Sequence, residues 1–250
     1  MLEFVIHLAK KAGGYLKQNI GTDLQIEFKG RINPVTRVDK GAQDIIFGEI
    51  ERVFPAHSVV AEEGVNKEAD SEYTWYVDPL DGTVNYLHRI PFFCVSIAVY
   101  RDNHPYIGVC YNPVSEELFS SEQGKGAFRN GERIFVSGTS RLIDSLIVTG
   151  FPYSADRIGE VVSRFSRVLG AVQGVRRFGS AAMDLCYVAA GSFDGFWEIG
   201  LFPWDVAAGA AIVLEAGGAV SGIEGNPFDV MCGNILASNS MIHKPLMNIM

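Results

Sequence analysis

The chain has 250 residues, 48% hydrophobic and 20% charged, and a formal net charge of −8. This length is enough for one large domain or two smaller ones without disulfides or structural metals. The negative charge argues against a general nucleic-acid binder, which needs a basic face. No apolar run approaches the ~20 residues of a membrane span, and the N-terminal stretch does not read as a signal peptide. We therefore expect a cytoplasmic protein with no nucleic-acid and no membrane partner.

The first part of the chain predicts two helices. Apolar residues at helical spacing predict one over residues 2–20, ended by Gly21, and another that begins near Asp39 and ends before Pro55. The buried side of the second helix is expected to comprise Ile45, Ile46, Ile50, Val53 and Phe54.

A run of strands is predicted next. Their patterns cover residues 58–61, 74–78, 92–100, 106–111 and 116–120. The dipeptide Asn130-Gly131 then predicts a hairpin turn with positive φ at both residues.

From about residue 140, predicted strands and helices alternate. The strands are SLIVT, VRRFG, FDGFWEI and NILAS, and the helices are SADRIGEVVSRFSRVLG, SAAMDLCYVAAG, PWDVAAGAAIVLEAGG and a terminal segment. A run of strands followed by alternation predicts two substructures, residues 1–140 and 141–250.

The four cysteines are far apart and form no C-x-x-C pair. They are Cys94, Cys110, Cys186 and Cys232, and three of them lie in apolar runs. Buried free thiols are therefore favoured over disulfides or a zinc site.

One motif, WYVDPLDGTVNY, places Asp78 and Asp81 close together directly after a strand pattern. The proline between them fixes φ and leaves the Leu80 carbonyl available. Gly82 and Thr83 follow, where free N–H groups could face an anion. A divalent cation such as Mg²⁺, which takes oxygen ligands, would explain carboxylates beside anion-binding amides. An exposed turn explains the motif equally well when it is taken alone.

Three further acids occur at the ends of predicted elements. In VVAEEG two acids are adjacent, and because side chains alternate along an extended chain only one of them can face a given site. We predict that Glu62 faces it, and that Glu63 is solvated or supports Glu62. Asp205 in PWDVAAG suits the positive end of a helix, and Asp39 suits an N-cap. Each of the three also has an ordinary structural explanation as an acidic loop or a helix terminus.

Taken in this order, WYVDPLDGTVNY, AEEG and PWDVAAGAAIVLEAGG resemble the inositol monophosphatase family of Mg²⁺-dependent, lithium-sensitive phosphatases. The signatures of that family are D-P-[IL]-D-G-T-x-N and W-D-x-A-A-G. PFFCVSIAVY, GKGAFRNG, GSAAMDLCYVAAG and NPFDVM extend the resemblance over nearly the whole chain. Two residues depart from it: Tyr86 replaces the usual Phe, and Asn33 stands where many members carry Asp in a mobile segment.

The resemblance implies a layered αβαβα fold with an N-terminal sheet-and-helix half, a C-terminal mixed-sheet half and a homodimer. It implies a first Mg²⁺ held by Glu62, Asp78 and the Leu80 carbonyl, and a second held by Asp78, Asp81 and Asp205. A third, weaker ion could rest on Glu62, and Mn²⁺ could replace Mg²⁺.

The implied reaction is hydrolysis of a small phosphorylated polyol or sugar, foremost myo-inositol 1-phosphate, by in-line attack of a metal-activated water. The catalytic residues would be Asp39, Glu62, Thr83 and Asp205. The substrate contacts would be Leu80, Asp81, Gly82, Thr83, Arg176, Gly179, Ser180, Ala181, Glu198 and Asp205. For Arg176, a second phosphate, a neighbouring subunit and a plain surface position all remain open. The alternatives for the whole protein are a fructose-1,6-bisphosphatase, a dual-activity sugar phosphatase and a non-catalytic scaffold.

Overall fold

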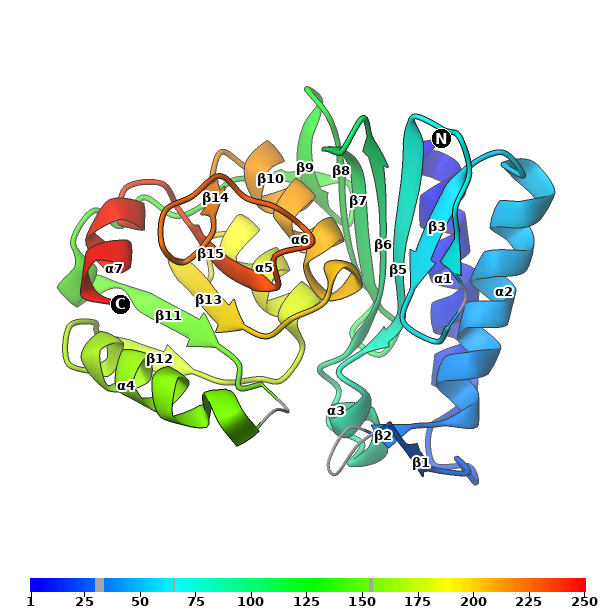
Figure 1. The fold of residues 1–250 in the computed structure, drawn as a ribbon, viewed down its shortest axis with the longest axis horizontal. Helices are drawn as coiled ribbons and strands as arrows, with labels where there is room; N and C mark the ends of the chain where they lie inside the picture. The colour runs from blue at the N-terminus through cyan, green and yellow to red at the C-terminus, as the bar shows by residue number, and fades with distance from the viewer. Residues whose placement is uncertain (30–33, 65, 153–154) are drawn as a thin grey trace.

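The computed structural model describes residues 1–29, 34–64, 66–152 and 155–250. Helices and sheets alternate in five layers, from α1 and α2 on one outer side to α4 and α7 on the other (Figure 1). This confirms the αβαβα fold. Asn33, the residue at which the chain departs from the family pattern, lies outside the described residues. Among the described helices, none is both long and apolar enough to cross a membrane.

The first outer layer and the first sheet come from the N-terminal part of the chain. The helices are α1 (Leu2–Asn19) and α2 (Arg37–Val53), with a short hairpin of β1 (Glu27–Phe28) and β2 (Pro34–Val35) between them. In the described residues, eight strands form the sheet in the order β10-β9-β8-β7-β6-β5-β3-β4. Their bounds are β3 (Ser58–Ala61), β4 (Asn66–Lys67), β5 (Tyr73–Asp81), β6 (Cys94–Arg101), β7 (His104–Asn112), β8 (Glu117–Glu122), β9 (Gly126–Arg129) and β10 (Glu132–Ile134).

The second sheet comes from the C-terminal part of the chain. Its described strands run in the order β12-β11-β13-β15-β14, with bounds β11 (Leu146–Thr149), β12 (Gly174–Arg176), β13 (Gly195–Ile199), β14 (Ala219–Ser221) and β15 (Asn234–Ser238). Helices α5 (Ala181–Ala189) and α6 (Pro203–Glu215) lie between the two sheets, and α4 (Ile158–Leu169) and α7 (His243–Ile249) cover the far side (Figure 1). Short helical turns occupy Leu142–Asp144 and Ala155–Arg157, and α3 (Thr83–Leu87) follows β5.

Alternation along the strands explains the layers, because successive side chains of a strand point to opposite faces. In β5, Trp75 and Val77 pack against α1 and α2, whereas Tyr76 packs against the middle helices. In β13, Trp197 faces α4 and α7 and Phe196 faces inward. Each sheet is therefore apolar on both faces and needs a helix layer on each side.

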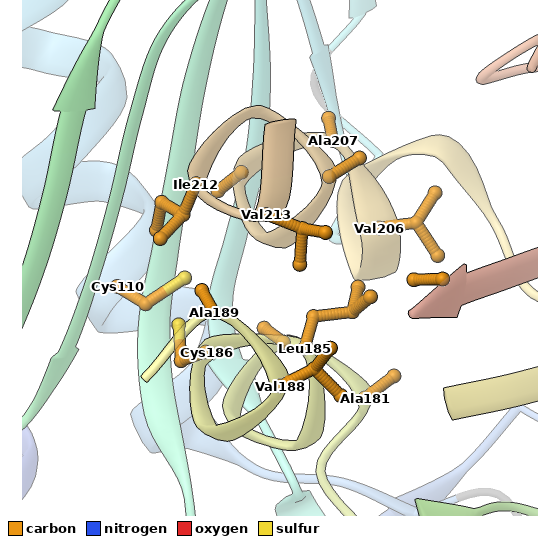
Figure 2. Close-up of a cluster of buried hydrophobic side chains, with 14 of the residues drawn as sticks. Cys110, Ala181, Leu185, Cys186, Val188, Ala189, Val206, Ala207, Ile212 and Val213 are labelled. Carbon is orange, nitrogen blue, oxygen red and sulfur yellow. The ribbon is translucent and has the colours of Figure 1, made fainter. Parts of the chain in front are cut away.

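Helices α5 and α6 are buried on nearly all sides, which is typical of helices enclosed within a protein. Leu185 and Val188 of α5 lie close to Val206 and Val213 of α6 (Figure 2). The Cys186 side chain points toward Cys110 of β7 (Figure 2). All four cysteines are free, and Cys94, Cys110 and Cys186 are buried as expected, whereas Cys232 is exposed.

Several local predictions need correction. Helix α2 begins at Arg37 with Thr36 as its N-cap, so Asp39 is not the N-cap but the third residue of the helix. Val53 is 38% exposed, because it lies at the end of α2 beyond the sheet-facing side. The Asn130-Gly131 turn is confirmed, with φ of 51° and 83°.

We predict that Gly209→Ala lowers the free energy of unfolding by about 1–3 kcal/mol, because overpacking forces neighbours apart. A Cβ at Gly209 would lie 2.5 Å from Leu185 Cβ, so α5 and α6 would have to separate. Chemical denaturation measures the change. The matched control is Gly48→Ala in α2, where a Cβ meets nothing within 4 Å; it should stabilise by about 0.5–1 kcal/mol. Equal stability of Gly209→Ala and the wild type would contradict the close α5–α6 contact.

Candidate active site

A cleft that is partly open to solvent lies where the two sheets and the middle helices meet. The first sheet contributes the ends of β3 and β5, and the second contributes the ends of β11 and β13. The starts of α3, α5 and α6 complete it. All the predicted metal ligands line this cleft: Glu62, Asp78, Leu80, Asp81 and Asp205.

The D-P-L-D-G-T motif forms the end of β5 and the start of α3. The pairing of β5 with β6 shifts register between Asp78 and Asp81, which brings two acids of one strand into the same cleft. Gly82 follows with φ of +90°, a conformation that L side chains rarely adopt. A Cβ there would also lie 3.1 Å from the Phe92 carbonyl oxygen. The motif is thus a strand-to-helix turn that only glycine fits without strain, rather than a simple surface turn.

Asp81 is bound by the start of α5, 99 residues away in the sequence. Ser180 Oγ donates a hydrogen bond of 2.5 Å to Asp81 Oδ2, and the Ala182 amide donates one of 2.8 Å to the same oxygen. Burial raises the pKa of Asp81 to about 7, although these two hydrogen bonds oppose the rise. The contact joins the two halves of the chain at the cleft.

Asp78 and Asp205 are each held by one nearby backbone amide. Leu80 N donates to Asp78 Oδ1 at 2.9 Å, and Phe202 N donates to Asp205 Oδ2 at 2.7 Å. Burial, followed for Asp78 by the charges of Glu62, Asp81 and Asp205, raises the pKa of both carboxyl groups well above the usual range. The ionised form of these carboxyl groups is therefore disfavoured unless a cation compensates their charge.

Glu62 faces the cleft, and Lys29 pairs with it. Lys29 Nζ lies 3.0 Å from Glu62 Oε1 and 2.5 Å from Glu63 Oε1. The Glu63 side chain is only 5% exposed, so it is not solvated and instead supports the site beside Glu62. Burial raises the pKa of Glu63 to about 6. Sequence reasoning missed Lys29, since no pattern links it to the acids.

Asp39 does not line the cleft itself but is hydrogen-bonded to Thr83, which does. Thr83 Oγ1 is 3.1 Å from Asp39 Oδ1 and 3.0 Å from the Leu80 carbonyl oxygen, and both are possible acceptors for its proton. The other Asp39 oxygen accepts from the Thr36 amide at 2.9 Å. Burial is the largest cause of the raised pKa of Asp39. The resulting link from α2 to the cleft orients the Thr83 hydroxyl.

The donor set suits a hard divalent cation, which prefers carboxylate and carbonyl oxygens. The four acids Glu62, Asp78, Asp81 and Asp205 each have a second oxygen that no hydrogen bond from a described residue reaches. Among the described residues, however, no three His, Cys, Asp or Glu side chains are already gathered tightly enough to hold one ion.

The other end of the cleft belongs to the second sheet. Glu198 of β13 is 8% exposed, and burial raises its pKa to about 8. Gly150 makes room for it, since a Cβ there would lie 2.1 Å from Glu198 Oε2. The predicted residues Gly179, Ser180 and Ala181 line the cleft beside it.

Of the arginine pair at the end of β12, Arg177 lines the cleft and Arg176 does not. Arg176 Nη1 donates to its neighbouring carbonyl, that of Val175, at 3.0 Å. Side chains alternate along an extended chain, so only one of two adjacent residues faces the site. The sequence therefore already indicated that one arginine of the pair would point away from the cleft. Phe151 and Leu201 also line the cleft and were not predicted.

Residues 1–249 match the inositol monophosphatase family. The chain belongs to this family. It is therefore a phosphatase of a family that is generally metal-dependent.

Individual relatives match this chain over nearly their whole length. The inositol-1-monophosphatase of Mesorhizobium japonicum is 43% identical, with 99% of this chain and 94% of the relative covered. The Nus factor SuhB of Escherichia coli is 40% identical, with the same coverage of 99% and 94%. A crystal structure of the extragenic suppressor protein suhB from Bartonella henselae is 43% identical, with a TM-score of 0.94 and coverage of 98% and 96%.

We predict that Glu198→Gln flattens the pH dependence of stability of the metal-free protein. The pKa of Glu198 is about 8 in the folded state, above the ordinary value of 4.5. The folded state binds the Glu198 proton more tightly than the unfolded chain does, so this proton stabilises the fold fully below about pH 4.5. That stabilisation is lost as the pH rises through about 8. In chelator, the fall in unfolding free energy from pH 5 to 8.5 should be smaller in Glu198→Gln by about 2–4 kcal/mol. Denaturation curves at several pH values, with exposed Glu68→Gln as control, measure it; equal slopes would contradict the prediction.

Proposed function

We propose that this phosphatase is a Mg²⁺-dependent phosphomonoesterase that hydrolyses myo-inositol 1-phosphate to inositol and phosphate. The observation that carries the proposal is the convergence of Glu62, Asp78, Asp81 and Asp205, from three separate segments, on one cleft beside Gly82 and Thr83. Fructose 1,6-bisphosphate is the alternative substrate, alone or alongside inositol phosphate. A cytoplasmic homodimer and sensitivity to lithium are further expectations that follow from the resemblance.

The four carboxylates and the Leu80 carbonyl would hold two or three ions, with Mn²⁺ able to replace Mg²⁺. When bound, such an ion is a Lewis acid that lowers the pKa of water and offsets charge on the phosphoryl group. Glu62 would exchange its ion pair with Lys29 for contact with the cation. The backbone amides of Gly82 and Thr83 would bind the phosphate oxygens.

The residues on either side of the phosphate would move the protons. Thr83, held by Asp39, would orient the attacking water and pass its proton toward the Asp39 carboxylate, with Glu62 assisting. Asp205 would hold the water that protonates the departing alkoxide. Glu198, at the far end of the cleft, would accept hydrogen bonds from hydroxyl groups of the polyol.

We expect Asp81→Asn to lower kcat/KM for myo-inositol 1-phosphate at least about 100-fold, because removing a group that stabilises developing charge has effects of this size. Phosphate release is measured with Mg²⁺ titrated from myo-inositol 1-phosphate, fructose 1,6-bisphosphate, histidinol phosphate and adenosine 3′,5′-bisphosphate. Metal binding is read separately, as the Tm increase that Mg²⁺ or Mn²⁺ causes in the wild type and that Asp81→Asn should reduce.

Asp70→Asn, on an exposed loop, is the control for both readouts. Folded wild-type protein that releases no phosphate from any of the four substrates, with either metal, would refute the proposed activity. A scaffold role would then be the better explanation.

We also expect Thr83→Val to lower kcat about 10- to 100-fold, the loss expected when a positioned proton-transfer group is removed. Thr83→Ser should keep most of the activity, because its hydroxyl can still bond to Asp39. Steady-state kinetics with myo-inositol 1-phosphate compare the two. If both variants are equally impaired, the methyl group rather than the hydroxyl is what matters, and the proton path through Thr83 fails.

A further inference from the structure

A second cavity lies between the β6–β7 turn and the loop that joins β14 to β15. Its described lining includes Tyr76 of β5, Tyr100 of β6, Asn103 of the turn, Pro105 of β7 and residues 228–231 of the loop. It shares no described lining residue with the active-site cleft. Tyr76 precedes the proposed metal ligand Asp78 by two residues, so the cavity and the cleft lie along the same side of β5.

Much of this lining is apolar or aromatic. Tyr76 and Tyr100 are 5% and 2% exposed, and their rings meet edge to face with centroids 5.0 Å apart. Phe228 and Pro105, both partly exposed, add further apolar surface. The face of an aromatic ring carries partial negative charge and attracts cations. The lining therefore suits a ligand with an apolar body, and it does not repel a positive charge.

One polar group of the cavity has no partner. The Tyr76 hydroxyl forms no hydrogen bond with another described residue, although the side chain is almost fully buried. The buried hydroxyls of Tyr86 and Tyr100, by contrast, each donate to a backbone carbonyl. A buried polar group without a partner costs free energy, so a ligand that bonds to the Tyr76 hydroxyl would remove that cost.

The charge at the cavity is negative. Asp229 Oδ1 accepts from the Met231 amide at 2.9 Å, and no described residue donates to Asp229 Oδ2. The pKa of Tyr76 is raised, first by burial and then by the charge of Asp229, so this carboxylate lies within electrostatic reach of the Tyr76 hydroxyl. No lysine or arginine is among the described lining residues, and the one basic side chain there, His104, is exposed. The cavity therefore favours a cationic ligand over an anionic one.

We propose that this cavity is a second binding site, for an organic ammonium ion with an apolar body. The ammonium group would donate to Asp229 Oδ2 and to the Tyr76 hydroxyl oxygen, and hydrogen bonds between charged groups are the stronger kind. The apolar body would lie against Tyr100, Phe228 and Pro105. The proposal does not depend on the phosphatase activity, because the two sites have separate linings.

The probe is 2-phenylethylamine, which carries an ammonium group on a short apolar body. Its binding to the full chain is measured by ligand-observed NMR titration in Mg²⁺ at about pH 8, where free imidazole is neutral and the amine is charged. The wild type should bind the amine more tightly than 2-phenylethanol, its uncharged analogue. Asp229→Asn should weaken amine binding about 10- to 100-fold, the effect of losing a hydrogen bond between charged groups. Tyr76→Phe, which removes only the hydroxyl, should weaken it by a smaller factor.

Two further variants are the controls. Asp102→Asn removes the same charge from the β6–β7 turn outside the lining, and should change amine binding less than about threefold because exposed charges are screened. Asp81→Asn removes an acid of the active-site cleft and should leave amine binding in place. Thermal unfolding of each variant shows whether it is folded.

Three results would overturn the proposal. Equal affinity for 2-phenylethanol would show that the positive charge is not recognised, and would rule out the ligand class. Loss of binding in Asp81→Asn but not in Asp229→Asn would place the amine in the acidic cleft and rule out the second site. No binding to the wild type at millimolar amine would rule out both. None of these results bears on phosphate release, which tests the proposed function separately.

Discussion

The site depends on keeping several carboxylates of like charge close together while they are largely removed from water. Burial without compensation is costly for ionised groups, and each acid here has its own donor. Asp78 uses the backbone amide of Leu80 after it, Asp205 uses that of Phe202 before it, Asp81 uses the start of α5, and Glu62 uses Lys29. These donors hold the acids on one cleft, and the raised pKa values show that they compensate the charge only in part. The remaining negative charge is what a divalent cation would neutralise.

The hydrogen bonds to Asp81 from Ser180 and Ala182 have a second consequence, because they join the end of β5 in the first sheet to the start of α5 in the middle layer. The acids that would hold metal come mostly from the first sheet, and the residues proposed to face the organic part of a substrate come mostly from the second sheet's side of the cleft. A change in the α5 contact would therefore move one set of groups relative to the other. Ser180 is in this respect a positioning residue as well as part of the lining.

The sequence was most informative at positions where the backbone conformation restricts which residue type can be accommodated. The D-P-L-D-G-T turn could be predicted because Gly82 occupies a conformation that favours glycine, and the hairpin at Asn130 because both turn residues have positive φ. The α2 start was misplaced by two residues because Thr36 and Asp39 are both capable of capping, and the structure uses Thr36.

Other features depend on contacts that no local pattern encodes. The Lys29 ion pair with Glu62 joins residues 33 apart, across an intervening helix. The sequence prediction chose Arg176, but the structure places Arg177 at the cleft instead, because alternation says that only one of the two faces it and not which one. The motif set identified the acids of the site, and the tertiary fold decided which other side chains share it.

The middle layer of helices has a consequence for how the protein folds. Because α5 and α6 are apolar on nearly every side, each sheet relies on them to cover its inner face. A fragment that ended at residue 140 would expose the apolar inner face of the first sheet to water, and such a patch favours aggregation. The boundary at residue 140 thus separates the two sheets but not two independent folding units. Loss of either half should therefore unfold the other, and the enzyme should unfold in a single cooperative transition.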